Sequence, residues 1–175
     1  MTYPHILRRA LKSLPLFSLL LLIGLLLTGC GIEFEPPTDG SETGRVINVI
    51  DGDTIVVDIG GRAETIRYVG INTPERDEPC YWDATRANEA LVEGRTVRLV
   101  RDVTNRDRYD RLLRYVYVGD TLVGREMIAQ GYAEVVLYEP DDRFYEEYRN
   151  LEIEAARAGL GCHPTGIFND GSDRR

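Results

Sequence analysis

The clearest pattern of hydrophobic and polar positions lies near the start of the chain's folded part. Three short runs rich in β-branched residues are separated by an Asp-Gly-Asp turn and a Gly-Gly pair; the runs cover residues 45–50, 54–59 and 63–69. Such runs joined by turn residues are typical of β-hairpins, because Gly and Asp adopt the backbone angles that tight turns need. The pattern predicts a three-stranded antiparallel meander.

The middle of the chain mixes helical and strand patterns. Small and apolar residues recur at helical spacing from Asp83 to Leu91. Two further strands are expected at residues 96–100 and 112–118, and the charged, turn-prone segment between them is expected to be a loop. A short helix is predicted for residues 125–130.

A longer amphipathic helix is expected near the C-terminus. Its apolar positions follow one another at intervals of four and three residues: Phe144, Tyr148, Leu151, Ala155 and Ala158. Asp141 or Asp142 is expected to cap its start, and Gly159 to end it. Strands and helices in this order do not alternate as in a βαβ fold. We therefore predict an α+β fold, an OB-like five-stranded β-barrel with about three helices.

The first thirty residues have the pattern of an export signal. A basic start precedes an apolar stretch at residues 14–27, as in a secretory signal peptide. The stretch is short for a transmembrane helix, which needs about 20 apolar residues. The stretch is followed by the sequence Leu-Thr-Gly-Cys, which ends at Cys30. This tetrapeptide resembles the bacterial lipobox, in which the cysteine is lipidated. We expect residues 1–29 to be removed and the domain to be exported and lipid-anchored to a bacterial membrane; an uncleaved membrane anchor is the alternative.

The remaining chain divides into three expected parts. Residues 30–43 are rich in Gly, Pro, Glu, Ser and Thr and are predicted to be a flexible tether. Residues 44–168 are predicted to form the folded domain. Residues 169–175 are expected to be a disordered tail.

Two further cysteines, Cys80 and Cys162, remain after the lipidated one. An exported domain permits disulfides, and this pair would close a loop of about 83 residues, worth about 4.5 kcal/mol in the chain-entropy model. We expect a disulfide between Cys80 and Cys162; two free thiols are the alternative. A zinc site lacks ligands, because His163 is the one histidine left once the signal is removed.

Charge and composition narrow the function. The formal net charge is −8, and it becomes −11 once residues 1–29 and their three basic residues are removed. This balance argues against a protein that coats nucleic acid through charge alone. The remaining basic residues are all arginine, and several lie within or next to the polar clusters described below. We expect a local basic groove on an acidic body, with weak, non-specific binding and a shallow salt dependence.

Three polar clusters are candidates for chemistry. They are the turn at residues 51–54, Arg67 with the Asn-Thr-Pro-Glu segment at 72–75, and the charged loop at 107–111. A hairpin joins the first two, so Asp53, Asn72 and Glu75 are expected to lie within reach of one cation, with Arg67 on the same rim. Each cluster alone is more typical of a plain turn, a helix start or a solvated loop.

The residue types in these clusters fit phosphodiester hydrolysis. Oxygen ligands without His or Cys suit a hard cation, Ca²⁺ or Mg²⁺, although no EF-hand pattern is present. The planar fork of arginine grips two phosphate oxygens. A cation and two arginines offset the negative charge that develops at phosphorus as water attacks. A carboxylate that does not bind the cation activates the water.

Together, the clusters resemble the thermonuclease family, the staphylococcal nuclease-like enzymes. The resemblance rests on VIDGDT at 49–54, IRYVGINTPE at 66–75 and DRYDRLLRYVY at 107–117, and it covers about residues 45–167. It implies an OB-like barrel and Ca²⁺-dependent cleavage of DNA and RNA with low sequence specificity, by attack at phosphorus that breaks the bond to the 5′ oxygen.

The resemblance also implies roles for single residues. The catalytic residues would be Arg67, which binds phosphate, Glu75, which positions or activates water, and Arg111, which stabilises the transition state. One Ca²⁺ ion would be held by Asp53, Asn72 and the backbone oxygen of Thr73. Tyr109 and Arg108 would contact the substrate, with single strands favoured.

One position departs from the family pattern. Asn72 stands where the type enzyme has a second Asp ligand. Its amide oxygen can still coordinate a cation, but one negative charge is lost, and Ca²⁺ affinity depends on ligand charge. We expect weaker Ca²⁺ binding than in an Asp version, with activity retained.

Two other functions are considered. One is a non-catalytic OB-like lipoprotein that binds nucleic acid; the other is an assembly lipoprotein that uses the barrel as a scaffold. The first would be favoured if Arg67, Glu75 or Arg111 were missing, and all three are present. A monomer is the default expectation, and the preference between DNA and RNA is left open.

Overall fold

A computed structural model describes residues 40–169 of the chain. The expected signal peptide, the lipidated Cys30, most of the tether and residues 170–175 of the tail lie outside the described residues. Between residues 40 and 169, no helix combines the length and the apolar character needed to cross a bilayer.

The predicted meander is present at the start of the described chain. Strand β1 (Glu42–Val49) pairs antiparallel with β2 (Thr54–Ile59), and β2 pairs antiparallel with β3 (Arg62–Tyr68). Gly60 and Gly61 both have positive φ angles, +60° and +87°, and form the turn between β2 and β3. This is the backbone that two-residue hairpin loops require.

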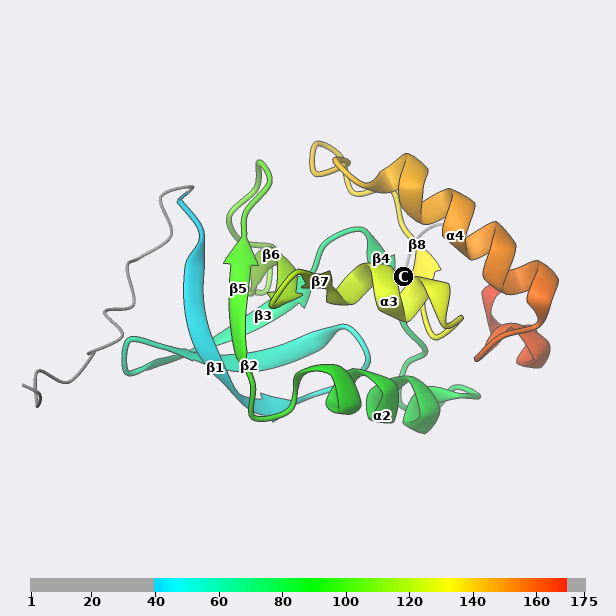
Figure 1. Ribbon diagram of the computed structural model, residues 1–175, viewed down its shortest axis with the longest axis horizontal. Coiled ribbons are helices and arrows are strands. Elements are labelled where there is room, and N and C mark those ends of the chain that lie inside the picture. Colours follow the sequence, from blue (N-terminus) through cyan, green and yellow to red (C-terminus); the bar gives the residue numbers. More distant parts are fainter. Residues whose placement is uncertain (1–39, 170–175) are drawn as a thin grey trace, which may run out of the picture. The chain divides into compact units, whose positions relative to one another are not determined.

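Two more strands close the sheet into a barrel. Strand β5 (Thr96–Val100) pairs antiparallel with β1, and β6 (Leu112–Val118) pairs antiparallel with β5. Strand β6 also pairs in parallel with β3, which completes the ring of β1, β2, β3, β5 and β6 within residues 40–169. The barrel stands on one side of the ribbon in Figure 1, and it confirms the predicted OB-like α+β fold. The short β7 (Thr121–Leu122) extends β6 as a hairpin.

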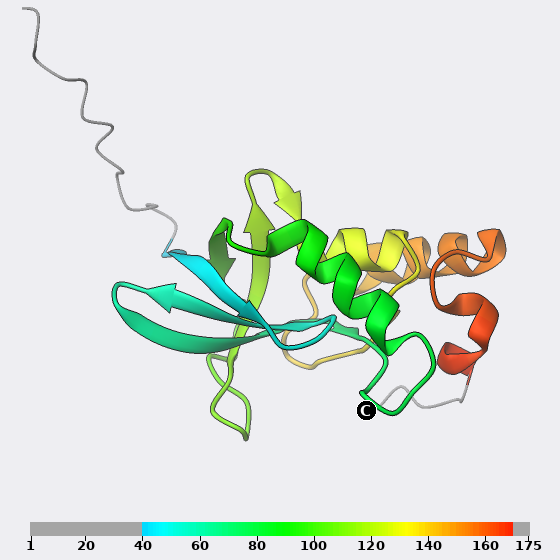
Figure 2. The ribbon, with the colours of Figure 1, turned by 90° about the horizontal axis from the view of Figure 1, so that it is seen from below.

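Three α-helices occur among residues 40–169, as predicted. They are α2 (Tyr81–Val92), α3 (Val123–Ala129) and α4 (Tyr145–Ala158). Helix α3 contacts both of the others and lies between them (Figures 1 and 2). Gly131 and Gly159 follow α3 and α4 with φ angles of +78° and +63°.

The predicted cap of α4 is wrong. Phe144 occupies the capping position, and no side chain caps the helix. The carboxylate of Asp141 instead accepts hydrogen bonds of 2.8 Å from the backbone N–H groups of Val103 and Thr104. Asp141 is therefore a buried anchor for the loop between β5 and β6 rather than a helix cap.

Two short strands were not predicted. Strand β4 (Ile71–Asn72) pairs antiparallel with β8 (Glu134–Val135), and Asn72 lies opposite Glu134. Strands of two residues carry no alternation that a pattern could reveal. This small sheet lies beside α3 and α4 in Figure 1 and brings two distant segments together.

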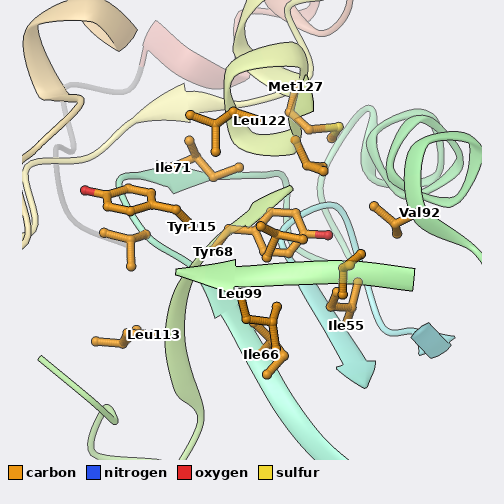
Figure 3. Packing of buried hydrophobic residues seen from close by; sticks show 14 of the residues in the cluster. Ile55, Ile66, Tyr68, Ile71, Val92, Leu99, Leu113, Tyr115, Leu122 and Met127 are labelled. Carbon is orange, nitrogen blue, oxygen red and sulfur yellow. The ribbon is translucent and has the colours of Figure 1, made fainter. Parts of the chain in front are cut away.

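The hydrophobic core fills the barrel and continues under the helices. Figure 3 shows Ile55, Ile66 and Leu99 from the barrel strands, with Leu122 and Met127 on the α3 side. All five are buried.

A disulfide joins Cys80 and Cys162, as predicted. It links the residue before α2 to the one before the 3₁₀ turn η2 (His163–Thr165). The two ends of the helical layer are thereby tied together.

Candidate functional site

The Asp-Gly-Asp turn holds its second carboxylate inside the fold. The backbone N–H of Asp53 donates to the Oδ1 of Asp51 over 3.1 Å, and the N–H of Ile50 donates to the carbonyl of Thr54 over 3.0 Å. The carbonyl of Asp53 accepts from the N–H of Tyr68 on β3 over 2.9 Å. Only 5% of Asp53 is exposed. The turn therefore presents a buried carboxylate to the end of β3.

Donors from three segments converge on the Asp53 carboxylate. Its Oδ1 accepts from the hydroxyl of Thr54 over 2.9 Å and lies 3.1 Å from the Nε of Arg67. Its Oδ2 accepts from the backbone N–H and the hydroxyl of Thr73, over 2.9 and 3.1 Å. The hairpin thus brings the first two polar clusters together at one end of the barrel.

Arg67 is fixed by the backbone around it. Its Nη1 donates to the carbonyls of Tyr68 and Ile71 over 2.7 and 2.8 Å. Its Nη2 donates to the Oδ1 of Asn72 over 3.2 Å. With the Asp53 contact described above, four contacts hold the Arg67 guanidinium. Its position is therefore set before any ligand binds.

Asn72 connects Arg67 to a carboxylate that sequence reasoning missed. Its Nδ2 donates to the Oε1 of Glu134 over 3.0 Å, and the two residues are only 3% and 6% exposed. Glu134 is 62 residues away along the chain and belongs to no motif. Its one sequence signal is an acid within the otherwise apolar run at residues 133–137.

Gly52 allows the close approach of the two clusters. A Cβ atom at Gly52 would lie 2.7 Å from the Cγ2 of Thr73 and 2.8 Å from its Cβ and Oγ1. These atoms cannot swing aside as the end of a long side chain can. Glycine is therefore required for Thr73 to reach Asp53.

Helix α2 braces the turn through Asn88. The hydroxyl of Tyr68 donates to the Oδ1 of Asn88 over 2.9 Å, and the Nδ2 of Asn88 donates to the carbonyl of Asp51 over 2.8 Å. Burial raises the pKa of Tyr68 far above its ordinary value, so the hydroxyl keeps its proton. Asn88 was also missed from the sequence, since polar residues in amphipathic helices usually face solvent.

Negative charge is concentrated at the turn. Burial, and then repulsion by the Asp53 carboxylate, raise the pKa of Asp51 to about 6. A cation near these two carboxylates would relieve that repulsion.

The third cluster is organised by Asp107. Its Oδ1 accepts from the backbone N–H groups of Tyr109 and Arg111 over 2.9 and 3.0 Å, and its Oδ2 accepts from the Nε of Arg111 over 2.7 Å. Asp110 has a φ of +66°, which lets the chain turn back toward Arg111. Burial alone would raise the pKa of Asp107, but the hydrogen bonds and charge of Arg111 and the Tyr109 amide hold it below its usual value.

The second and third clusters share one pocket of about 370 Å³. Its lining includes Arg67, Asp107, Arg108, Tyr109, Arg111 and Glu139. Tyr109 is 64% exposed. The guanidinium carbons of Arg108 and Arg111 lie 4.7 and 5.4 Å from its ring centre. The pocket therefore offers three cations and an accessible aromatic face.

Glu75 lies apart from these contacts. It follows the buried Thr73 and Pro74 and is itself exposed. Its backbone N–H donates to Glu78 over 2.7 Å, while its carboxylate makes no hydrogen bond to another described residue. Glu75 is thus available to solvent at the end of the segment that carries Asn72 and Thr73.

The donors at the barrel end suit a hard cation. Within residues 40–169, no three His, Cys, Asp or Glu side chains gather as a metal site. Asp53, Asn72 and Thr73 nevertheless bring a carboxylate, an amide oxygen and hydroxyl or carbonyl oxygens together, without nitrogen or sulfur ligands. Ca²⁺ accepts such a mixed set of oxygens, so the residues present fit this ion. Beside it, the arginines are suited to hold a phosphate.

Comparison with known proteins identifies similar chains. Residues 65–162 match the family described as staphylococcal nuclease homologue. A thermonuclease from Staphylococcus hyicus is 31% identical over 66% of this chain and 72% of its own length. A thermonuclease from Staphylococcus intermedius is 31% identical over 82% of this chain and 89% of its own. Endonuclease YncB of Bacillus subtilis (strain 168) is 39% identical over 63% of this chain and 59% of its own.

Proposed function

Because this chain belongs to the staphylococcal nuclease family, we propose that it is a Ca²⁺-dependent nuclease that hydrolyses DNA and RNA with low sequence specificity. The observation that carries the proposal is the single pocket shared by Arg67 and Arg111. Arg67 also contacts Asp53 and Asn72, the two side chains that offer oxygens to a cation. A phosphate in this pocket would meet both arginines at once.

The chain's own residues would bind and orient the substrate. Arg67 and Arg111 hold non-bridging phosphate oxygens, which fixes the phosphorus for attack and offsets its growing negative charge. Arg108 and the ring of Tyr109 bind the neighbouring phosphate and sugar or base. Contacts of this kind grip the backbone of a polynucleotide rather than base edges, so sequence specificity is low.

Glu75 would handle the proton of the attacking water. As the water oxygen bonds to phosphorus, one water proton passes to the Glu75 carboxylate. The P–O5′ bond breaks, and the O5′ takes up a proton from solvent to leave as a 5′-hydroxyl, while the phosphate stays on the 3′ side. Asp53, Asn72 and Thr73 would hold the cation. When bound, Ca²⁺ supplies positive charge that offsets charge on the phosphate oxygens.

We also propose that the nuclease acts outside the cytoplasm as a lipid-anchored monomer. The lipobox-like ending at Cys30 supports the anchor. Labelling of cells with a fatty-acid analogue should mark the wild-type protein and leave Cys30→Ala unmarked. Label on Cys30→Ala would contradict this anchor.

Plasmid DNA and an RNA transcript, incubated with the purified chain, test the activity. Cleavage is expected with Ca²⁺ and not with a chelator, and the new ends should be 5′-hydroxyls and 3′-phosphates. Glu75→Gln and Arg111→Ala should each lose at least about 10²-fold in kcat. Glu154→Gln and Arg157→Ala, on the exposed side of α4, are matched controls and should cleave normally. Binding without cleavage would instead indicate a non-catalytic nucleic-acid-binding protein.

A further inference from the structure

We propose that the disulfide between Cys80 and Cys162 positions Glu75 for catalysis, so that the oxidised chain turns over its substrate faster than the reduced chain. The inference rests on the proposed function, because it concerns the carboxylate that is expected to activate water. The role is distinct from stabilising the fold, because the disulfide fixes one end of the short exposed segment that begins at Glu75.

The upstream end of that segment is fixed by the candidate cation site. Thr73 donates two hydrogen bonds to Asp53, and Pro74 is buried. The chain then runs over the surface, and four of the five residues at 75–79 are exposed. Exposed residues pack little against the fold, so the position of this segment depends strongly on how its two ends are held.

A closed turn links the position of Glu75 to that of Glu78. The backbone N–H of Glu78 donates to the carbonyl of Glu75 over 2.8 Å, and the N–H of Glu75 donates to the Oε2 of Glu78 over 2.7 Å. Only Pro79 separates Glu78 from Cys80, and its ring fixes φ, so this link is short and stiff. The contacts that hold Cys80 therefore also limit where Glu75 can lie.

Cys80 has a backbone conformation that needs support. Its φ is +72°, a value that non-glycine residues rarely adopt, and it precedes α2 without a side-chain cap. Such a conformation persists where the surrounding structure enforces it. Two features do so here. The disulfide bonds Cys80 directly to Cys162, and the next residue, Tyr81, is buried with its hydroxyl donating to the carbonyl of Ile50 over 3.4 Å.

Cys162 is a firm anchor for this bond. It is fully buried, and its backbone N–H donates to the carbonyl of Gly131 over 2.8 Å. A Cβ atom at Gly161 would lie 2.5 Å from the carbonyl carbon and oxygen of Gly131, so the two backbones are in direct contact. Gly131 follows α3, which contacts strand β6 of the barrel. The disulfide thus ties the loop before α2 to an element that packs on the barrel (Figures 1 and 2).

Loss of the disulfide should loosen Glu75 and spare the other parts of the site. The cation ligands and the arginines are held by the β2–β3 hairpin, by residues 71–73 and by the loop between β5 and β6. We therefore expect kcat to fall, with little change in KM or in Ca²⁺ affinity. A small misplacement of a catalytic group can cost about 10²-fold in rate.

A double-mutant cycle with Glu75→Gln separates positioning from stability. The kcat and KM for single-stranded DNA are measured at saturating Ca²⁺ on the full chain, and circular dichroism gives the folded fraction. Cys80→Ser with Cys162→Ser is expected to lose about 10- to 100-fold in kcat. In a Glu75→Gln background the same loss should largely vanish, because the carboxylate to be positioned is already gone. Equal losses in both backgrounds would overturn the proposal.

Two further variants complete the series. Gly60→Ala, in the turn between β2 and β3, is the control for lowered stability and should keep the wild-type kcat. Two glycines inserted between Glu78 and Pro79 lengthen the link while both cysteines stay in place, and kcat should fall as it does without the disulfide. If the double Ser variant does not fold, the insertion decides. A folded insertion variant with the wild-type kcat overturns the proposal, and a loss that vanishes with Glu75→Gln supports it.

Reduction tests the same role in the wild type. Dithiothreitol acts by thiol–disulfide exchange: it becomes a cyclic disulfide, and the sulfurs of Cys80 and Cys162 each gain a hydrogen. Wild type with two free thiols, counted by alkylation and mass analysis, should have the kcat of the double Ser variant. An unchanged kcat after reduction would overturn the proposal.

The outcomes separate the inference from the proposed function. If the wild type does not cleave with Ca²⁺, the proposed function fails and the inference fails with it. If the wild type cleaves, Glu75→Gln is impaired and the double Ser variant keeps the wild-type kcat, the inference alone is wrong.

Discussion

At the scale of single residues, the site depends on close contacts that leave no spare volume. Gly52 and Thr73 are an example, because a methyl group at Gly52 would lie within 2.8 Å of three Thr73 side-chain atoms. Thr73 in turn donates twice to Asp53. A change at Gly52 should therefore reach the cation site through Thr73.

Gly52→Ala is expected to reduce Ca²⁺ affinity and to lower the free energy of unfolding by about 1–3 kcal/mol, the usual cost of overpacking. Urea unfolding and calorimetric titration measure the two effects. Gly60→Ala is the control, because its Cβ meets nothing within 4 Å and only its φ of +60° is unfavourable. It should lower stability while leaving Ca²⁺ affinity intact. Equal Ca²⁺ affinity in both variants would contradict this account.

Asp107 is the second residue whose charge can be tested. Its folded-state pKa lies below the ordinary value of 3.8, so it stabilises the fold above that value and loses this contribution as the pH falls through the folded pKa. Asp107→Asn keeps an acceptor for the backbone amides but loses the charge that faces Arg111. It should cost about 1 kcal/mol at neutral pH, since Arg111 is partly exposed.

The unfolding free energies of wild type and Asp107→Asn, measured across pH, should converge in acid. The gap is expected to be full at pH values above 3.8 and to close below the lowered pKa. A gap that stays constant or widens in acid would show that the charge of Asp107 is not what stabilises the loop.

The residues of the site were only partly predictable. The meeting of Asp53 and Asn72 at Arg67 follows from sequence, because a hairpin that joins two motifs fixes which strand ends are adjacent. Glu75, expected in the same group, lies apart from these contacts. Glu134 and Asn88 could not be found in this way. Each reaches the site through one side chain from a distant segment, and a single polar residue in an apolar run or a helix carries no periodic signal.

At the scale of secondary-structure elements, the long strands could be predicted from the sequence. Strands β2, β5 and β6 have the predicted bounds, because each has a full run of β-branched or aromatic residues between turn signals. The two-residue strands β4 and β8 escape such reasoning, as does the loop-anchoring role of Asp141. Both depend on tertiary pairing rather than on local pattern.

Helix α2 gives the element-scale prediction. Asn88→Ala would leave the Tyr68 hydroxyl and the Asp51 carbonyl without their partner, and unpaired buried groups cost about 1–3 kcal/mol each. We expect a loss of about 2–4 kcal/mol in urea unfolding, with weaker Ca²⁺ binding because the turn is released. In a Tyr68→Phe background the loss should shrink, since the hydroxyl is already gone. Additive losses would contradict the bridge.

At the scale of the whole molecule, the disulfide connects parts that the barrel does not hold. Cys80 and Cys162 are 82 residues apart. Replacing both with Ser should lower the free energy of unfolding by about 3–4.5 kcal/mol, because the unfolded chain regains freedom. Reductant should lower the melting temperature of the wild type and leave the double Ser variant unchanged. An equal response of the two proteins to reductant would contradict a stabilising disulfide.

The net charge of the chain also limits how it can hold a polynucleotide. The whole chain carries −8, yet Arg67, Arg108 and Arg111 line one pocket. If those three arginines make the phosphate contacts, binding of single-stranded DNA should weaken with salt, with a slope of about −2 in a plot of log affinity against log salt concentration.

Fluorescence anisotropy with the Glu75→Gln variant, which is expected to be inactive, measures this slope without cleavage. Adding Arg108→Ala should make it shallower by about 0.7, whereas Arg157→Ala should not change it. A slope steeper than about −5 would mean that the phosphate contacts extend well beyond this pocket. The polynucleotide would then have to follow a longer row of basic residues that keeps it away from the acidic surface.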